Sequence, residues 1–206
     1  MSETRTEAGA QRRLKLRERL LDAARRSIAA RGLAGLKERD LAAEAGCALG
    51  AIYTAFDDLD ELILRVNVST LERLGESLDA ALAQAAPAEA LLALARAYLG
   101  FARREEPSWR ALFEHRLASG AAVPDWYAET RNRLFSRLET PLAALLPDHD
   151  AVSRAALART LFSAVHGVVV LGLEQKLAET SPEALDHQLD ALVRLLATGL
   201  DAEARR

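Results

Sequence analysis

Hydrophobic residues recur along the chain at the spacing of amphipathic helices. Near the N-terminus, Leu16, Leu20 and Ile28 lie at multiples of four residues and share one face of a helix. We predict this helix over about Gln11–Arg31, ending at Gly32. The alternation of Val, Ile or Thr with polar residues that is typical of strands never lasts beyond a few positions. The pattern therefore predicts an all-α chain.

Proline divides the later part of the chain into helical segments. A proline inside a helix removes a hydrogen bond, so we expect each one to lie at a helix boundary. All six are found beyond residue 86, at Pro87, Pro107, Pro124, Pro141, Pro147 and Pro182.

Two apolar segments near the C-terminus differ in pattern. The stretch VHGVVVLGL, residues 165–173, is apolar on every side, so a helix there must be covered all round. The final helix is predicted to start with Ser181 as its cap and Pro182 at its first position. Its apolar face is formed by Leu185, Leu189, Leu192, Val193, Leu196 and Leu200.

Charge and cysteine content limit what the chain can be. The 206 residues include 27 basic and 30 acidic ones, a net charge of −3, so any nucleic-acid footprint must be local. The single cysteine, Cys47, excludes an internal disulfide and a multi-cysteine zinc site. Residues 1–20 lack the apolar core of a signal peptide, and no stretch of about 18 uncharged apolar residues occurs. We expect a cytoplasmic protein that does not cross a membrane.

Positive charge is concentrated at the N-terminus. Residues 1–31 hold nine basic and four acidic residues. Such runs usually mark a solvated helix face. This one directly precedes a segment with the pattern of a DNA-reading motif, which raises a phosphate-binding role as the alternative.

That segment, LKERDLAAEAGCALGAIYTAF from Leu36 to Phe56, has the pattern of a helix-turn-helix. A short helix is expected to end near Ala45, and Gly46 can take the left-handed backbone that a sharp turn needs. The second helix of such a motif offers its N-terminal residues to base edges in the major groove. The inward positions are Leu41, Ala42, Ala45, Cys47, Ile52 and Phe56.

The stretch RDLAAEAGCALGAIYTAFDDLDELI, preceded by LLDAARRSIAARGL, resembles the N-terminal domain of the TetR (tetracycline-repressor) family of transcription regulators. Together the matching positions cover some fifty residues. They are Leu41-Ala42, Ala45-Gly46, Gly50, Ile52-Tyr53, Phe56 and Glu61-Leu62.

The resemblance implies two domains, a helix-turn-helix DNA-binding domain with a basic arm over residues 1–62 and a helical effector-binding and dimerisation domain over residues 63–206. It implies a ligand-responsive repressor that binds a near-palindromic operator in double-stranded DNA. The repressor would be a homodimer joined through its last two helices and released by a small apolar or amphipathic effector. We expect no cofactor, no metal site and no catalytic residue.

The resemblance also carries over individual DNA contacts. Arg39 lies where a family member reaches a guanine edge, which suits the two donors of a guanidinium. Leu49 and Ala51 can meet thymine methyl groups, and Tyr53 and Thr54 offer hydroxyls to phosphate or base. The predicted DNA-binding residues are Arg12, Arg13, Lys15, Lys37, Arg39, Ala48, Leu49, Gly50, Ala51, Tyr53 and Thr54.

The chain also departs from the family's pattern. Ala48 stands where the family usually has Ser or Thr, and Leu59 where it usually has Lys, so two phosphate contacts are missing. Residues 37–62 hold two basic and seven acidic residues, although Asp58 to Glu61 also has the form of a capping box. We therefore expect a shallow salt dependence of binding, since each neutralised phosphate contributes about −0.9 to the log–log slope.

Seven of the ten aromatic residues lie between residues 98 and 135, which suits either a core or the wall of an apolar ligand site. His166, alone on an apolar helix, is more often a core histidine than a ligand. Arg103, His115 and Arg116 can orient a carboxylate or lie in solvent. The predicted ligand-binding residues are Tyr98, Phe101, Trp109, Phe113, Trp126, Tyr127, Phe162 and His166.

Two other classes stay open on sequence alone. An enzyme finds little support, because a phosphate-binding glycine loop, a nucleophile elbow and clustered metal ligands are all missing from the sequence. A helical homodimer with a degenerate DNA-binding domain, acting through protein contacts, is favoured by Ala48, Leu59 and the acidic run. Cys47 is expected to pack as a small hydrophobe rather than to sense redox state.

Overall fold

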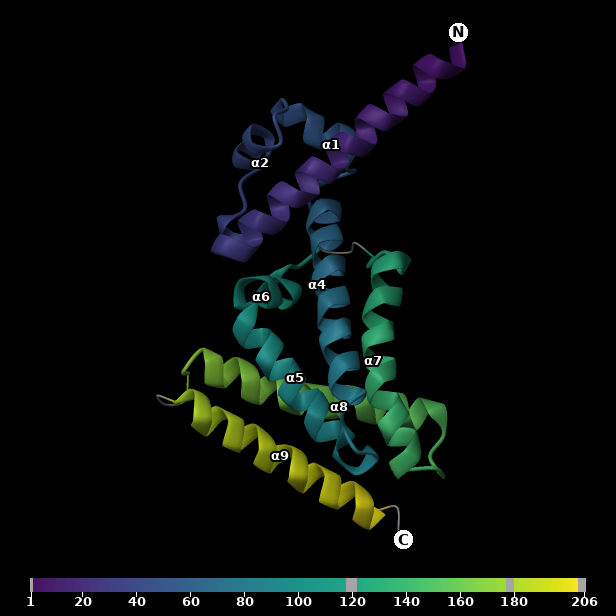
Figure 1. Ribbon diagram of the computed structural model, residues 1–206, viewed down its shortest axis with the longest axis vertical. Helices are drawn as coiled ribbons and strands as arrows, with labels where there is room; N and C mark the ends of the chain where they lie inside the picture. Colours follow the sequence, from purple (N-terminus) through teal and green to yellow (C-terminus); the bar gives the residue numbers. More distant parts are fainter. Residues whose placement is uncertain (1, 118–121, 177–179, 204–206) are drawn as a thin grey trace. The chain divides into compact units, whose positions relative to one another are not determined.

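A computed structural model describes residues 2–117, 122–176 and 180–203, and every regular element among them is helical (Figure 1), which confirms the all-α prediction. The elements are α1 (Ser2–Arg31), η1 (Leu33–Gly35), α2 (Glu38–Glu44), η2 (Leu49–Ala51), α3 (Ile52–Ala55), α4 (Leu59–Leu82), η3 (Pro87–Glu89), α5 (Ala90–Arg104), α6 (Glu106–Glu114), α7 (Asp125–Leu145), α8 (Ala151–Leu173) and α9 (Pro182–Glu203).

The chain forms two compact units. The N-terminal unit comprises Met1–Thr70 and Glu105–Tyr127, and the C-terminal unit comprises Leu71–Arg104 and Ala128–Arg206. Helix α4 therefore contributes its first half to one unit and its second half to the other. The functional domain boundary expected after residue 62 stays a prediction.

Helix α1 is longer than the sequence pattern indicates. It starts at Ser2 rather than near Gln11, because the first residues are mostly good helix formers even though they carry no apolar stripe. It ends as predicted at Gly32, which has a φ of 69° and whose N–H donates to the Ile28 carbonyl at 2.8 Å.

The N-terminal unit has its own core under the helix-turn-helix. Leu20 and Ile28 from α1, Leu41 from α2, Ile52 from α3 and Leu62 from α4 are all essentially inaccessible to solvent. Cys47 packs partly buried against this cluster, at the inward position that its hydrophobic character predicts.

Gly46 makes the predicted turn between α2 and the second helix. Its φ is 64°, a left-handed conformation that costs glycine little and other residues more. The Cys47 N–H then bonds back to the Ala42 carbonyl at 2.9 Å, which closes the turn. The short second helix begins as the 3-10 turn η2 and continues as α3.

Five of the six prolines lie at element boundaries, and the prediction for Pro141 is wrong. Pro141 lies inside α7, where it cannot donate a hydrogen bond to the preceding turn. Leu142 and Leu146 directly after it are buried in a core cluster of the C-terminal unit. Burying two leucines is worth about 3–6 kcal/mol, against about 3 kcal/mol for a proline inside a helix. Packing therefore keeps the helix continuous.

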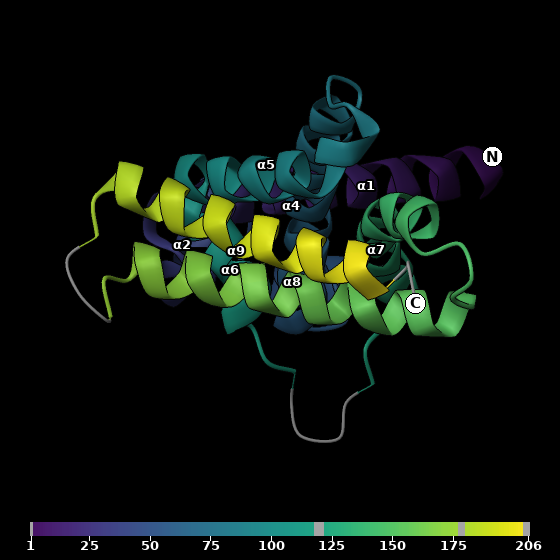
Figure 2. The same ribbon diagram turned by 90° about the horizontal axis from the view of Figure 1, so that it is seen from below.

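In the C-terminal unit, α8 and α9 lie side by side and α5 packs against both (Figure 2). Gly172 leaves room for Leu185 between α8 and α9, because a Cβ built on Gly172 would lie 2.4 Å from Leu185 Cδ1 and the leucine side chain would have to move. Helix α9 begins as predicted, with the Ser181 hydroxyl accepting from the Ala184 N–H at 3.2 Å and Pro182 at the first position.

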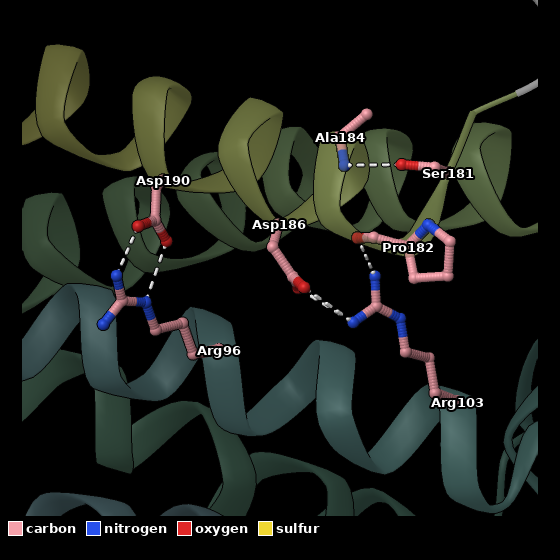
Figure 3. A network of polar contacts seen from close by, with 7 residues as sticks. All are labelled: Arg96, Arg103, Ser181, Pro182, Ala184, Asp186 and Asp190. Carbon is pink, nitrogen blue, oxygen red and sulfur yellow. Dashed lines mark hydrogen bonds and ion pairs between the residues drawn. The ribbon is translucent and has the colours of Figure 1, made fainter.

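Two arginine–aspartate pairs join α5 to α9 (Figure 3). Arg96 holds both carboxylate oxygens of Asp190, with Nε 2.8 Å from Oδ1. Arg103 donates to Asp186 Oδ1 at 2.8 Å and to the Pro182 carbonyl at 2.6 Å. The guanidinium of Arg103 is thus engaged within the fold, so the reading of this residue as an anchor for an effector carboxylate loses its basis.

Helices α8 and α9 leave apolar side chains uncovered within the single chain. Leu195 on α9 is 74% exposed and Leu171 on α8 is 40% exposed. Helix α8 is also, among the described residues, the one helix long and apolar enough to cross a membrane, with 22% of its most apolar window buried. A single helix of this kind is weak evidence for a membrane span, because a helix covered by protein has the same composition.

Candidate nucleic-acid interface

The helix that would enter a DNA groove exposes a row of small and uncharged residues. Ile52 and Phe56 point into the core, whereas Leu49 and Tyr53, one turn apart, are 41% and 52% exposed. The exposed face is completed by neighbours that the sequence predicted as DNA contacts, Ala48, Gly50 and Thr54, while Ala51 is half-buried. The prediction and the exposed surface thus coincide on this helix.

Arg17 of α1 holds the far end of this helix. Its Nη1 donates to the Ala55 carbonyl, the last residue of α3, at 2.5 Å. Its guanidinium carbon also lies 4.3 Å from the centroid of the Phe56 ring, within the range of a cation–π interaction. Sequence reasoning assigned no role to Arg17, because nothing local distinguishes it from the other arginines of α1.

The same guanidinium neutralises part of the acidic run. Arg17 Nη2 lies 2.5 Å from Glu61 Oε1, and Arg65 Nε lies 3.3 Å from that oxygen. Partial burial raises the pKa of Glu61, but hydrogen bonds from the Asp57 N–H and from the two arginines outweigh this effect, so the pKa lies below its ordinary value. Glu61 is therefore a paired carboxylate at neutral pH.

The predicted capping box at the start of α4 is present in a slightly shifted form. The Glu61 N–H donates to Asp58 Oδ1 at 2.7 Å, as a capping box requires. Glu61 Oε2 reaches back to the N–H of Asp57, at 2.9 Å, rather than to that of Asp58. Two backbone donors at the helix start are thus satisfied by the acidic residues themselves.

The remaining acids of this region mostly meet partners inside the N-terminal unit. Three of the seven acidic residues of residues 37–62, namely Asp40, Glu44 and Glu61, are paired with arginines and therefore repel phosphate less than unpaired carboxylates would. The contacts are Glu44 with Arg26 at 2.7 Å, Asp40 with Arg31 at 3.8 Å, Asp60 with His115 at 3.4 Å, and Glu38 with the Tyr53 hydroxyl at 2.9 Å.

Another set of cations in this unit has no such partner. These side chains are exposed and make no hydrogen bond or ion pair with the described part of the chain. They are Arg12, Arg13, Lys15, Arg19, Lys37 and Arg39. Arg12, Lys15 and Arg19 share one face of α1 by their spacing of three and four residues.

Arg19 is the cation of this set that the predicted DNA contacts missed. Its Nη1 lies 3.9 Å from where a Cβ would stand on Gly46, so it reaches the turn of the helix-turn-helix. The signal was available in the sequence, because Arg19 continues the face that Lys15 begins one turn earlier.

The predicted ligand-binding residues fall in both compact units, four in each. In the C-terminal unit, Tyr98 from α5 meets Phe162 and His166 from α8. The Tyr98 hydroxyl lies 2.7 Å from His166 Nδ1, and the Phe162 and His166 rings stack with centroids 5.5 Å apart. Phe101, the fourth member, is buried on α5. Phe135 of α7, which was not predicted, packs edge-on against Phe162 at 5.4 Å.

Burial affects the protonation of His166. It lowers the pKa of the imidazole below its ordinary value of 6.5, so the ring is neutral at pH 7. The rings of Tyr98, Phe162 and His166 are therefore uncharged, whereas the guanidinium carbon of Arg159 lies 5.7 Å from the centroid of the Phe135 ring. Adjoining uncharged rings suit an apolar or amphipathic molecule.

The other four residues belong to the N-terminal unit. Trp109 is fully buried and meets Phe113 edge-on at 5.6 Å, while Trp126 and Tyr127 open α7 with ring centroids 6.1 Å apart. Arg65 of α4 lies 3.8 Å from the centroid of the Trp126 ring. His115 is nearly buried beside Asp60, and Arg116 is exposed.

Known proteins resemble both parts of this chain. Residues 20–66 match the profile described as bacterial regulatory proteins of the tetR family, and residues 91–196 match that of the tetracyclin repressor-like C-terminal domain. None of the curated proteins matches.

Several solved structures share the fold. A protein of unknown function from Rhodococcus sp. RHA1 is 26% identical, with a TM-score of 0.72 over 90% of this chain and 95% of its own. A transcriptional regulator from Rhodococcus sp. Rha1 is also 26% identical, with a TM-score of 0.64 over 90% of this chain and 97% of its own. A possible TetR family transcriptional regulator from Streptomyces coelicolor A3(2) is 16% identical, with a TM-score of 0.65 over 90% and 98%.

Proposed function

This chain belongs to the TetR family of transcription regulators, and from that premise we propose that it is a cytoplasmic, homodimeric repressor released from a near-palindromic operator by a small effector. The observation that carries the proposal is the surface of the helix-turn-helix. An exposed, uncharged helix face lies in the same compact unit as the six exposed cations named above, which have no partner in the described part of the chain. Phosphate contacts position a protein on DNA and base contacts specify the sequence, so the two kinds of surface suit the two tasks.

In this proposal exposed cations of α1, together with Lys37 before α2, contact phosphates, and the exposed face of η2 and α3 meets the major groove. Arg39 reads a guanine, while Leu49 and Ala51 contact thymine methyl groups. The predicted set of Arg12, Arg13, Lys15 and Lys37 supplies phosphate contacts, and Arg19 joins it. Arg17 has another task, because it holds α3 against α1 and α4.

The dimer forms through α8 and α9. Their exposed apolar side chains need a cover that the single chain does not supply, and a second copy can provide it by two-fold symmetry. Two recognition helices then lie about 34–36 Å apart, the spacing of two half-sites one helical turn apart.

The effector binds among the predicted aromatic residues, with Tyr98, Phe162 and His166 as its first contacts. The neutral imidazole and its aromatic neighbours favour an apolar or amphipathic molecule. An effector releases DNA only by binding better to the conformation that fits the operator poorly.

Selection from a random pool of double-stranded DNA tests the function. We expect the full-length protein to enrich a palindrome at low salt, and a panel of apolar and acidic metabolites then shows which molecule releases it. Failure to enrich any sequence would favour the alternative, a helical homodimer with a degenerate DNA-binding domain that acts through protein contacts.

Arg39→Ala tests the assignment of base contacts on the selected operator. It should relax discrimination at one base pair of each half-site by about 1–3 kcal/mol, measured by competition between operator variants. Arg116→Ala, an exposed arginine of the same unit outside the motif, serves as the control and should leave discrimination unchanged. Equal behaviour of the two variants would remove Arg39 from the base-reading set.

A further inference from the structure

Tyr53 is the largest side chain on the exposed face of the recognition helix, and its hydroxyl is already engaged. The Tyr53 hydroxyl donates to Glu38 Oε1 at 2.9 Å. Glu38 is the first residue of α2, so the bond links the two helices of the motif across the turn. The carboxylate also raises the pKa of Tyr53 by accepting a hydrogen bond from the phenol, which favours the protonated form.

This hydrogen bond decides whether the Tyr53 hydroxyl acts as a donor or as an acceptor towards DNA. A phenol has one proton to donate and lone pairs to accept with. Because a carboxylate has no proton, Tyr53 must be the donor in this pair, and its oxygen faces outward only as an acceptor. Phosphate oxygens and the keto oxygens of guanine and thymine are acceptors as well, so they cannot bond to it.

The DNA groups that can still bond to the Tyr53 oxygen are the amino groups of the bases. In the major groove, adenine presents N6–H₂ and cytosine presents N4–H₂, and both are donors. A carboxylate accepts from such groups too, and Glu38 has a second oxygen for which the structure shows no partner. Phosphate is repelled by the same negative charge.

We propose that Glu38 acts as a specificity-determining residue, which holds Tyr53 as a hydrogen-bond acceptor and so selects an adenine or cytosine at one position of each half-site. This inference rests on the proposed function, since it assumes that the motif binds DNA. The inference goes beyond the proposed function by giving a role to Glu38. This residue is acidic, whereas a phosphate contact at the same surface would require a cation.

The experiment begins with the operator that the wild-type protein selects, so its first readout concerns the proposed function alone. In both half-sites the selected adenine is replaced by purine, which lacks the N6 amino group, or the selected cytosine by pyrimidin-2-one, which lacks the N4 amino group. Wild-type affinity should fall about 2- to 10-fold for each half-site, the value of one hydrogen bond. Tyr53→Phe keeps the ring and loses the phenol acceptor, so its affinity should fall less on the replacement than the wild-type affinity does, with the Glu38 carboxylate as the one acceptor left of this pair.

Glu38→Gln is the second variant. An amide can turn either its oxygen or its NH₂ towards Tyr53, so the direction of the bond is no longer fixed. We expect the preference for amino-bearing bases to fall, and the affinity for all sequences to rise as the negative charge is lost. Circular dichroism confirms that both variants fold.

Two results would overturn the proposal while leaving DNA binding intact. One is a loss of affinity in Tyr53→Phe that is equal for all sequences and accompanied by a smaller salt slope, which is the behaviour of a phosphate contact. The other is an unchanged preference in Glu38→Gln. If the wild-type protein selects no sequence at all, the proposed function fails first and this inference fails with it.

Discussion

The two compact units differ in which of their exposed side chains are paired with other parts of the chain. In the N-terminal unit the apolar residues of α1 to α4 close over a core, and Arg116 joins the six exposed cations named above in having no partner among the described residues. In the C-terminal unit, Arg96 and Arg103 are engaged by aspartates of α9, whereas apolar side chains such as Leu195 stay exposed. Exposed charges without an ion pair and exposed apolar side chains without cover are available for contact with another molecule. The unpaired cations of the first unit suit the phosphates of DNA, and the uncovered apolar side chains of α8 and α9 suit a second copy of the chain, which is how the proposed function uses them.

The largest effect is expected from breaking the apolar side of this comparison. Leu195→Glu places a charge at the surface of α9 that we assign to the dimer, and burying it unpaired twice in a symmetric interface costs about 3 kcal/mol or more. We expect a monomer by light scattering and a loss of operator affinity of about 100-fold. Val123→Glu, an exposed apolar position of the N-terminal unit, is the matched control and should stay dimeric. A dimeric Leu195→Glu protein would place the interface elsewhere.

A smaller effect separates the paired from the unpaired cations of α1. Arg17→Ala leaves the Ala55 carbonyl without its side-chain donor and removes one of the two arginines paired with Glu61, so the free energy of unfolding should fall by about 1–3 kcal/mol in urea titrations. Arg12→Ala removes an exposed cation and should change stability by less than about 0.5 kcal/mol.

The salt dependence of DNA affinity should change more in Arg12→Ala than in Arg17→Ala, the reverse of their order in stability. If Arg12 contacts a phosphate in each subunit, its loss reduces the slope of log affinity against log salt by about 0.9 per contact. Arg17→Ala should weaken DNA binding with little change in the slope of log affinity against log salt. In the proposed function Arg17 positions α3 and makes no contact with the DNA phosphates. If both variants changed the unfolding free energy and the salt slope by the same amounts, the distinction between the paired Arg17 and the unpaired Arg12 would be wrong.

The smallest effect concerns protonation in the aromatic cluster of the C-terminal unit. Burial depresses the pKa of His166 in the folded state, so the unfolded chain takes up the proton more readily as the pH falls. The stability contributed by the neutral ring is present above pH 6.5 and is lost as the pH falls from 6.5 towards the depressed folded-state pKa. His166→Asn cannot titrate, so its unfolding free energy should lack this decrease between pH 7 and lower pH. If the curves of unfolding free energy against pH were parallel for the wild type and His166→Asn, the titration of His166 would not explain the decrease.

Much of the fold follows from local rules. Helical spacing predicts the all-α chain, and Gly32 and Gly46 take the positive φ expected of them. Ser181 and Asp58 cap the helices that their positions indicate. These features depend on residues within a few positions of one another, so the sequence is sufficient to predict them.

The sequence by itself therefore determined the all-α class, the helix-turn-helix, the family and several helix ends, but not the start of α1. Only the tertiary structure decided which arginines of the basic run are paired, since the partners of Arg17 lie 38 and 44 residues away. It also decided that packing keeps α7 continuous through Pro141 and that the predicted aromatic residues divide between two units. The physical reason is that pairing and burial depend on which distant segments meet. Every arginine in a run looks alike until the fold brings a carboxylate to one and solvent to another.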